Sequence, residues 1–178
     1  MTTGSDGKRL FFALSPDDEC RRYLEALQRQ LPPLKKGRWV RPKNLHLTLA
    51  FLGNVTEPVI ARLAILAENL RGHPMEIHLA RCGLWRRQQI LWVGPLSCPP
   101  PLTQLVDQLQ QLQVSIGLVP EDRVYMPHVT LARRAQLESP LPEITPFCWR
   151  SDRFSLMQSV AESDGVGYSV IGEWRLSH

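Results

Sequence analysis

The sequence contains no apolar run long enough to cross a membrane. Residues 45–52 form one of its longest apolar stretches, which is less than half of the roughly 20 residues that a spanning helix needs. Residues 1–9 are polar and only a short apolar stretch follows them, which is not the pattern of a secretory signal peptide. We therefore expect a cytoplasmic protein.

Patterns typical of zinc sites, disulfide frameworks and multidomain chains are also missing. The cysteines form no C-x-x-C pair, which argues against a four-thiolate zinc site, and in the cytoplasm we expect them to stay reduced. No Gly/Ser-rich linker divides the chain, so we expect one monomeric domain over residues 8–178 after a flexible tail at residues 1–7. The cysteines are Cys20, Cys82, Cys98 and Cys148.

What the sequence does contain is the composition of a globular domain. Of its 178 residues, 43% are hydrophobic and 21% are charged. A chain of this length buries roughly 70% of its unfolded surface, enough for a core without disulfides. Twenty-one Lys and Arg against 17 Asp and Glu give a formal net charge of +4, an excess that suits an anionic ligand without specifying one.

Apolar periodicity predicts alternating strands and helices. Strands are expected at residues 9–14, 44–52, 75–84, 90–93 and 124–132, and helices at residues 16–31, 56–72 and 102–112. Ser15 is the expected N-cap of the first helix, with Pro16 at its first position. The basic segment after this helix is interpreted as a loop. Residues 147–176 are predicted to form two long strands joined near residues 162–165.

The two halves of this pattern repeat. Leu10 precedes His46 by 36 positions and Leu91 precedes His128 by 37, with a strand and a helix between them in each case. The histidine strands carry the same signature, His-Leu-Thr-Leu and His-Val-Thr-Leu. This indicates a duplication with an approximate two-fold axis, which would bring the two histidine strands side by side. We predict an α+β fold of two lobes, with antiparallel sheets lining a central cleft and helices outside.

Alternation along each strand predicts a polar face made of histidine and threonine. His46 shares its face with Thr48, and His128 shares its face with Thr130. Two imidazoles around one cleft suit acid–base chemistry near neutral pH, one taking a proton from water and the other giving a proton to a leaving oxygen. The hydroxyls can donate to oxygens that develop negative charge. An in-line displacement at phosphorus fits such a pair best.

Two other interpretations of the histidines compete with a catalytic pair. A single His-x-Thr is more often a core or surface histidine, but two copies at the same offset from a strand–helix unit are hard to obtain by chance. A zinc site needs a third ligand, and no His, Cys or carboxylate accompanies either copy at ligand spacing. We expect no catalytic metal and no cofactor. The catalytic interpretation fails if the rings lie on separate surfaces or if main-chain carbonyls occupy their nitrogens.

The two motifs and their surroundings resemble the two-histidine phosphoesterases, and most closely their RNA 2′,3′-cyclic phosphodiesterase branch, also called 2′-5′ RNA ligases. The residues that carry the resemblance are 39–53 (WVRPKNLHLTLAFLG) and 125–133 (YMPHVTLAR), and it extends over nearly the whole chain. It implies hydrolysis of a 2′,3′-cyclic phosphate to a 2′-phosphate without metal, and a reversible RNA-joining activity. It also suggests His128 as the base and His46 as the acid.

The resemblance implies roles for four further residues. Thr48 and Thr130 would bind the phosphate with help from Arg133, and Phe51 would stack on the terminal base. Strict alternation, however, puts Arg133 and Phe51 on the apolar face of their strands. Either the strand ends or bulges before Arg133, or the neighbouring Arg134 acts instead. For Phe51, a place in the hydrophobic core is the alternative.

Two basic clusters are candidates for contacting an RNA backbone. The first precedes the first motif, surrounds Trp39 and consists of Lys35, Lys36, Arg38, Arg41 and Lys43. A solvated loop is its alternative interpretation. The second lies beside Trp85 and consists of Arg81, Arg86 and Arg87. The histidines without repeated context are expected to be structural or exposed: His73, His78 and His178.

Three functions remain open at this point. The first is a cyclic phosphodiesterase acting on RNA ends, with oligonucleotide or tRNA-like partners. The second is the same chemistry on a small cyclic nucleotide or an ADP-ribose cyclic phosphate, for which the basic residues would give no advantage. The third is a non-catalytic nucleotide- or RNA-binding module, against which the intact motifs argue.

Overall fold

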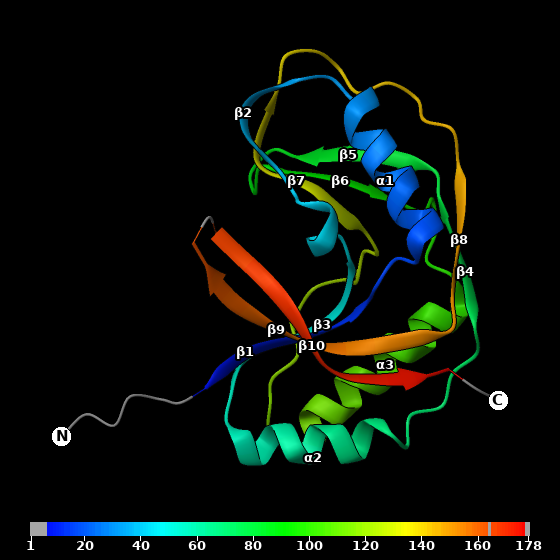
Figure 1. The fold of residues 1–178 in the computed structure, drawn as a ribbon. Coiled ribbons are helices and arrows are strands. Elements are labelled where there is room, and N and C mark those ends of the chain that lie inside the picture. Colours follow the sequence, from blue (N-terminus) through cyan, green and yellow to red (C-terminus); the bar gives the residue numbers. More distant parts are fainter. Residues whose placement is uncertain (1–6, 164, 177–178) are drawn as a thin grey trace.

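A main antiparallel sheet forms the centre of the molecule. In the computed structural model, which describes residues 7–163 and 165–176, its strands follow the order β10-β9-β1-β3-β7-β6-β5, and β2 pairs with β7 outside this path (Figure 1). A second, two-stranded sheet pairs β4 with β8. The strands are β1 (Lys8–Leu14), β2 (Leu34–Trp39), β3 (Leu47–Val55), β4 (Met75–Leu79), β5 (Arg81–Trp85), β6 (Ile90–Gly94), β7 (Val129–Leu137), β8 (Phe147–Ser151), β9 (Arg153–Glu162) and β10 (Gly165–Arg175).

The helices lie outside the sheets and bury one apolar side each. They are α1 (Asp18–Gln30), the 3₁₀ turn η1 (Pro42–Asn44), α2 (Glu57–Ala67) and α3 (Pro100–Ser115). In α1 the buried residues are Cys20, Leu24 and Leu27, at the spacing of one helical face. Figure 1 shows α2 and α3 next to each other beneath β1 and β3, and α1 beside β5, β6 and β8.

The helices α1 and α3 each contact the half of the sheet opposite to their own. Each of them reaches the motif strand of the other half. Helix α1 follows β1, yet its Gln28 donates from Nε2 to the carbonyl of Leu131 in β7. Helix α3 follows β6, yet its Gln113 donates from Nε2 to the carbonyl of Phe51 in β3. The two halves therefore share one core and are not independent lobes.

The predicted meeting of the histidine strands is confirmed. Strands β3 and β7 are antiparallel neighbours, and their registered pair is Leu47 with Val129, the residues directly after the two histidines. Through this short junction the sheets of the two lobes join into one. The α+β fold class predicted from the sequence is also confirmed.

Several predicted boundaries were wrong. The expected basic loop is strand β2 over its first part, paired with β7. The expected strand at residues 75–84 is two strands, β4 and β5, in different sheets. Residues 124–128 are irregular, and β7 instead runs on to Leu137. The segment 147–176 contains β8 in addition to the predicted hairpin of β9 and β10. The second helix ends at Ala67, well before residue 72.

The N-terminus of α1 also differs from the prediction. Asp17, not Ser15, is the N-cap, and its carboxylate accepts a hydrogen bond of 2.7 Å from the backbone N–H of Cys20. A carboxylate here also interacts favourably with the helix dipole, which a serine hydroxyl does more weakly. The predicted tail lies outside the described residues apart from Gly7. Among the helices of the described ranges, none is long and apolar enough to span a membrane.

Candidate active site

Both motif histidines lie one residue before a strand, not within it. His46 precedes β3 and His128 precedes β7. Each ring is held in the same way: Nδ1 of His46 lies 2.7 Å from the carbonyl of Asn44, and Nδ1 of His128 lies 2.8 Å from the carbonyl of Met126. A carbonyl accepts only, so Nδ1 carries the proton and Nε2 has the lone pair in the neutral ring.

The Nε2 atoms are therefore the nitrogens available for proton transfer. In His46, Nε2 lies 3.1 Å from the hydroxyl oxygen of Thr48, the polar partner expected from the motif. One nitrogen of each ring is bound to a main-chain carbonyl and one is not, so the carbonyl contacts orient the rings without consuming both nitrogens. The two rings also lie close enough that a charge on His128 lowers the pKa of His46.

A β-bulge resolves the position of Arg133. Strand β7 pairs Thr130 with Trp92 and Ala132 with Leu91, so that Leu131 is an extra residue opposite β6. The extra residue reverses the alternation, and Arg133 therefore lies on the same face as Thr130. Arg134, whose φ is +53°, lines neither of the two cavities beside the histidines.

The same irregularity occurs in the first motif. Strand β3 pairs Thr48 with Ala13 and Ala50 with Phe12, which leaves Leu49 as the extra residue. Phe51 consequently lies on the face of Thr48, and its side chain is 41% exposed, not buried in the main core. The two halves thus use matching bulges to present an aromatic ring on one side and a guanidinium on the other.

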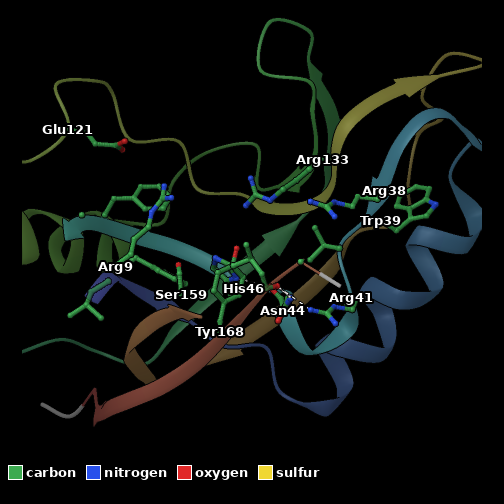
Figure 2. Close-up of a pocket in the computed structure, with 17 residues that line it drawn as sticks. Arg9, Arg38, Trp39, Arg41, Asn44, His46, Glu121, Arg133, Ser159 and Tyr168 are labelled. Atoms are coloured by element: carbon green, nitrogen blue, oxygen red, sulfur yellow. Dashed lines mark hydrogen bonds between the residues drawn. The ribbon is translucent and has the colours of Figure 1, made fainter. Parts of the chain in front are cut away.

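The larger cavity, of about 590 Å³, opens beside His46. Arg133 and Arg38 extend over it from β7 and β2, opposite His46 and Tyr168 (Figure 2). Among the residues that the structure describes, its charged lining residues are four arginines and one carboxylate: Arg9, Arg38, Arg41, Arg133 and Glu121. Its lining also includes Phe51 and Ser159. This excess of positive charge suits an anionic ligand with more than one charged group.

The smaller cavity, of about 250 Å³, opens beside His128. Phe51 and Glu121 line both cavities and therefore mark the boundary between them. The walls of the smaller cavity carry Thr48, Tyr125 and Met126, the aromatic ring of Trp85 and the amides of three glutamines. Its Glu121 and Arg123 form an ion pair of 2.8 Å, so this side has little excess charge.

Burial dominates the titration of both histidines. The pKa of His46 is lowered from 6.5 to about 4, mainly by burial and also by the positive charges of Arg133 and His128, against the carbonyl of Asn44, which raises it. The pKa of His128 is also lowered, by burial first and then by Arg123 and Arg133. Arg133 therefore influences both rings. At neutral pH the free protein holds two neutral imidazoles.

Aromatic rings fix the positions of both imidazoles. Phe11 and Tyr168 lie with their ring centroids 4.9 Å from that of His46, and Tyr168 meets it edge-on. Trp85 meets His128 edge-on at 4.5 Å. Tyr125, half-buried in the loop before His128, donates its hydroxyl proton to the carbonyl of Thr48 over 2.9 Å. This hydrogen bond joins the second motif to the first.

The predicted basic residues occupy different positions. Arg38 and Arg41 line the larger cavity, whereas Lys35, Lys36 and Lys43 line neither cavity. Arg41 and Lys43 also pair with Glu162, which holds η1 against the β9–β10 turn. In the second cluster only Trp85 reaches a cavity: Arg81 lies over the ring of Trp92, and Arg86 and Arg87 are exposed in the β5–β6 turn. Thr130 lines neither cavity.

Sequence reasoning missed several cavity residues. Arg9, Tyr168 and Ser159 lie far from either motif in the sequence and enter the site only through the pairing of β1, β9 and β10. Glu121 lies in the loop four residues before the second motif. No local signal distinguishes them from other strand or loop residues. Tyr125 stood inside the second motif, but its link to Thr48 depends on the β3–β7 junction.

Within the described ranges, potential metal ligands do not gather at the two motif histidines. Among the described residues, the one grouping of three His, Cys, Asp or Glu side chains with donor atoms in mutual reach is Glu76, His78 and Cys148, on the β4–β8 sheet. None of these three lines either cavity. All four cysteines are free thiols, as expected.

Two His-x-Thr motifs related by an approximate two-fold axis, at the centre of an antiparallel α+β fold, define the class of two-histidine phosphoesterases. The profile of the LigT-like phosphoesterases matches residues 14–92 and residues 93–168, so that each match contains one motif. The chain belongs to this family, and the resemblance noted in the sequence is confirmed.

Individual relatives cover almost the entire chain. The RNA 2′,3′-cyclic phosphodiesterase of Escherichia coli K12 is 31% identical over 97% of this chain and 99% of its own, and that of Aquifex aeolicus is 28% identical over 85% and 88%. The crystal structure of E. coli LigT with 3′-AMP superimposes with a TM-score of 0.89 at 30% identity, over 97% of this chain and 100% of that chain.

Proposed function

We propose that the protein is an RNA 2′,3′-cyclic phosphodiesterase that hydrolyses cyclic phosphate ends to 2′-phosphomonoesters without a catalytic metal or cofactor. The observation that carries the proposal is the pair of imidazoles, each fixed through Nδ1 so that Nε2 is left for proton transfer, with the electrostatic influence of Arg133 on both. The names of the relatives, at about 30% identity over nearly full length, support the same substrate.

The proposed reaction is a single in-line displacement. Nε2 of His128 takes a proton from a water molecule while the oxygen of that water attacks phosphorus. The bond between phosphorus and O3′ breaks, and protonated His46 gives its proton to O3′, which leaves a 3′-hydroxyl and a 2′-phosphate. Thr48, Thr130 and Arg133 donate hydrogen bonds to the phosphate oxygens as their charge grows.

His46 can act as an acid only if the substrate raises its pKa. One negative charge at 4 Å contributes about 4 kcal/mol at the effective dielectric constant of a partly buried site. This is enough to raise the pKa of His46 from about 4 to near neutrality. The cyclic phosphate carries such a charge, so substrate binding itself would raise the pKa of His46 and allow this ring to be protonated.

The larger cavity is the proposed site of the nucleotides upstream of the cyclic phosphate. Arg9, Arg38 and Arg41 would neutralise backbone phosphates, and Phe51 at the cavity boundary would stack on the terminal base. Lys35, Lys36 and Lys43 lie outside the cavities. They would contact only the part of a longer RNA that extends beyond the cavities. This arrangement favours an oligonucleotide over a small cyclic nucleotide or an ADP-ribose cyclic phosphate.

The test is to incubate the protein with a 2′,3′-cyclic-phosphate oligonucleotide in excess chelator and to locate the phosphate of the product. We expect a 2′-phosphate, formed at a higher kcat/KM than from a cyclic mononucleotide. Equal rates on both substrates would favour the small-molecule alternative. RNA affinity without turnover between pH 5 and 8 would favour a binding module. A cytoplasmic monomer remains the expected form of the protein.

The cavity beside His128 favours a reversible joining activity as well. One water needs only roughly 10–15 Å³, far less than the 250 Å³ on the side of the proposed base. Its amides and aromatic rings, with little excess charge, suit a nucleoside whose 5′-hydroxyl would replace water as the attacking group and give a 2′-5′ linkage.

Adjacent glutamines of α3 offer a matched test of this joining activity. Gln110 lines the cavity beside His128, whereas Gln111 does not. Gln110→Trp should fill the cavity and lower the ratio of joined to hydrolysed product about tenfold, with hydrolysis preserved, and Gln111→Trp should leave the ratio unchanged. An unchanged ratio in Gln110→Trp would contradict the joining proposal without affecting the hydrolytic one.

A further inference from the structure

The β4–β8 sheet carries a set of metal-ligating side chains on its outer face. Buried and exposed residues alternate strictly along β4, and Ile77 is wholly buried between exposed Glu76 and His78. On β8, Trp149 is buried between exposed Cys148 and Arg150. The exposed face of this small sheet is therefore held in place by a well-anchored inner face.

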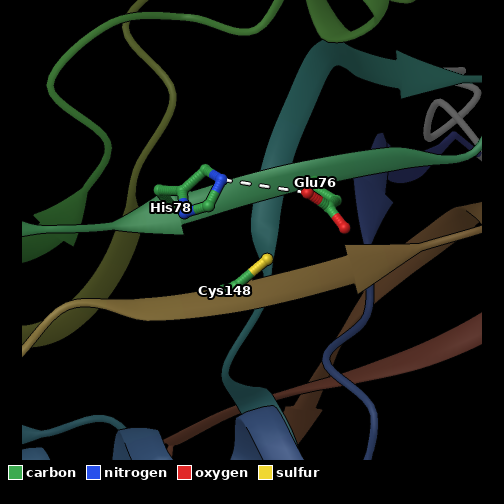
Figure 3. Close-up of side chains that lie close together, drawn as sticks. All are labelled: Glu76, His78 and Cys148. Atoms are coloured by element: carbon green, nitrogen blue, oxygen red, sulfur yellow. Dashed lines mark ion pairs between the residues drawn. The ribbon is translucent and has the colours of Figure 1, made fainter.

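Strand register brings the donors together. Cys148 pairs directly with His78, and residues paired across antiparallel strands point to the same face. Glu76 lies two positions before His78, also on that face. Figure 3 shows the imidazole and the carboxylate on β4 on either side of the Cys148 sulfur on β8, and the donor atoms of the three all lie within 4.8 Å of one another.

This donor set selects the class of ion. Ligands in tetrahedral coordination of zinc lie 2.0–2.3 Å from the metal and hence roughly 3.3–3.8 Å from each other. The three exposed side chains would have to close by only about 1 Å to meet this geometry. One thiolate, one imidazole and one carboxylate suit Zn²⁺ and similar thiophilic ions, whereas Mg²⁺ and Ca²⁺ prefer oxygen ligands alone.

Arg150 orients the carboxylate and does not block it. Its Nε donates to Oε1 of Glu76 over 3.0 Å, while Oε2 lies 3.9 Å from Nε2 of His78. One carboxylate oxygen thus has a partner outside the cluster and the other faces it, which is the usual state of a metal-binding carboxylate. The positive charge of Arg150 will weaken the affinity for a cation without preventing binding.

We propose that Glu76, His78 and Cys148 form a surface site for one Zn²⁺ ion, with water as the fourth ligand. The site is separate from the cleft, since none of the three residues lines either cavity. It does not enter the phosphodiesterase reaction. It gives His78, which the sequence suggested to be merely structural or exposed, a ligand-binding role.

The test is a titration of the full chain with Zn²⁺ by calorimetry and with Co²⁺ by absorption spectroscopy. We expect one site of micromolar affinity, with a thiolate-to-cobalt charge-transfer band in the near ultraviolet. Cys148→Ser should abolish this band, and both Cys148→Ser and His78→Ala should weaken binding at least tenfold.

Two matched variants isolate the site from other thiols and histidines. Cys98→Ser removes another free thiol, and His73→Ala removes an exposed histidine from the segment just before β4; both should leave binding unchanged. Absence of the charge-transfer band in the unmodified protein would overturn the proposal, as would equal affinity in Cys148→Ser. Hydrolysis should be the same in all four variants, so loss of the phosphodiesterase activity would bear only on the proposed function.

Discussion

At the scale of single residues, the site combines burial with fixed orientation. His46 is only 9% exposed, yet its Nδ1 retains a carbonyl partner and its Nε2 lies by a threonine hydroxyl. Burial makes the ring a weak base in the free protein. In the proposed mechanism a bound phosphate reverses this, so that the acid–base pair is complete only when the substrate supplies its charge.

The pKa of His46 predicts how stability depends on pH. Because the folded pKa, about 4, lies below the ordinary value of 6.5, the unfolded chain binds more protons between these values. The free energy of unfolding should therefore fall as the pH decreases from 6.5 to 4, with about 3 kcal/mol lost through this residue. The lowered pKa of His128 acts in the same direction.

Urea unfolding at a series of pH values measures this effect. His46→Gln should flatten the profile relative to that of the unmodified protein. A His46→Gln profile as steep as that of the parent would show that the burial of this imidazole does not control acid stability.

The neighbouring arginines of β7 provide a second residue-scale prediction. Arg133 lies on the cavity side of the bulge and lowers the pKa of both histidines, whereas Arg134 lines neither cavity. Arg133→Met should reduce kcat/KM on a cyclic-phosphate oligonucleotide about 10–100-fold, since a charge-assisted hydrogen bond to phosphate is lost. Arg134→Met should stay within about twofold. Steady-state kinetics that ranked the two variants the other way would assign the phosphate to Arg134.

At the scale of elements, the bulges decide which side chains reach the cleft. Alternation along the sequence predicted that His46 and Thr48 share a face, which their contact bears out, but it put Phe51 and Arg133 on the wrong face. The sequence pattern does not reveal an extra residue where two apolar residues follow each other, as at residues 49–50 and 131–132. Only the register against β1 and β6 reveals it.

Strand β2 was missed for a related reason. Its residues are mostly lysine, arginine and glycine, which have low strand propensity, and it forms because it can pair with β7. Gly37, with φ of +104°, is required there because a Cβ would lie 2.6 Å from the carbonyl oxygens of Arg133 and Arg134. This approach places Arg38 over the cavity.

A hydrogen bond from α3 supports the element that carries Phe51. Gln113 is 2% exposed and donates over 2.8 Å to the carbonyl of Phe51, just beyond the bulge of β3. Gln113→Leu should cost about 1–3 kcal/mol of stability, because it removes the donor from a buried carbonyl. It should also raise KM more than it lowers kcat, since the proposed stacking surface loses its support.

Chemical unfolding and steady-state kinetics of the same variant test both parts. Gln111→Leu, two positions before Gln113 in α3 and exposed, is the control for changes in helix propensity. Equal stability of the two variants would mean that the buried amide does not hold the bulge in place.

At the scale of the whole molecule, the duplication predicted that the two histidine strands meet. It did not predict that elements of each half pack against the other half. The spacing of the two motifs was enough to predict neighbouring histidine strands. Three features depend on contacts between residues far apart in the sequence. They are the packing of α1 and α3 on the opposite half of the sheet, the pairing of β4 with β8 and the pairing of β1 with β9. Arg9 and Tyr168 become site residues only through these long-range pairings.

Because elements of each half pack against the other half, we predict that neither half folds alone. A chain divided between residues 95 and 96 would separate β1 from β9 and β4 from β8, leaving apolar faces and strand edges uncovered. Each fragment should lack a cooperative thermal transition in circular dichroism, and an equimolar mixture should recover one. Cooperative unfolding of either fragment by itself would indicate that the lobes are independent.

Turnover of His46→Ala and His128→Ala on a 2′,3′-cyclic-phosphate oligonucleotide, measured beside His73→Ala, tests whether two imidazoles act on one phosphate. Each loss of a placed proton-transfer group should lower kcat by about 100-fold or more, with the fold intact by circular dichroism, while His73→Ala retains full activity. Wild-type turnover in either His46→Ala or His128→Ala would contradict the account.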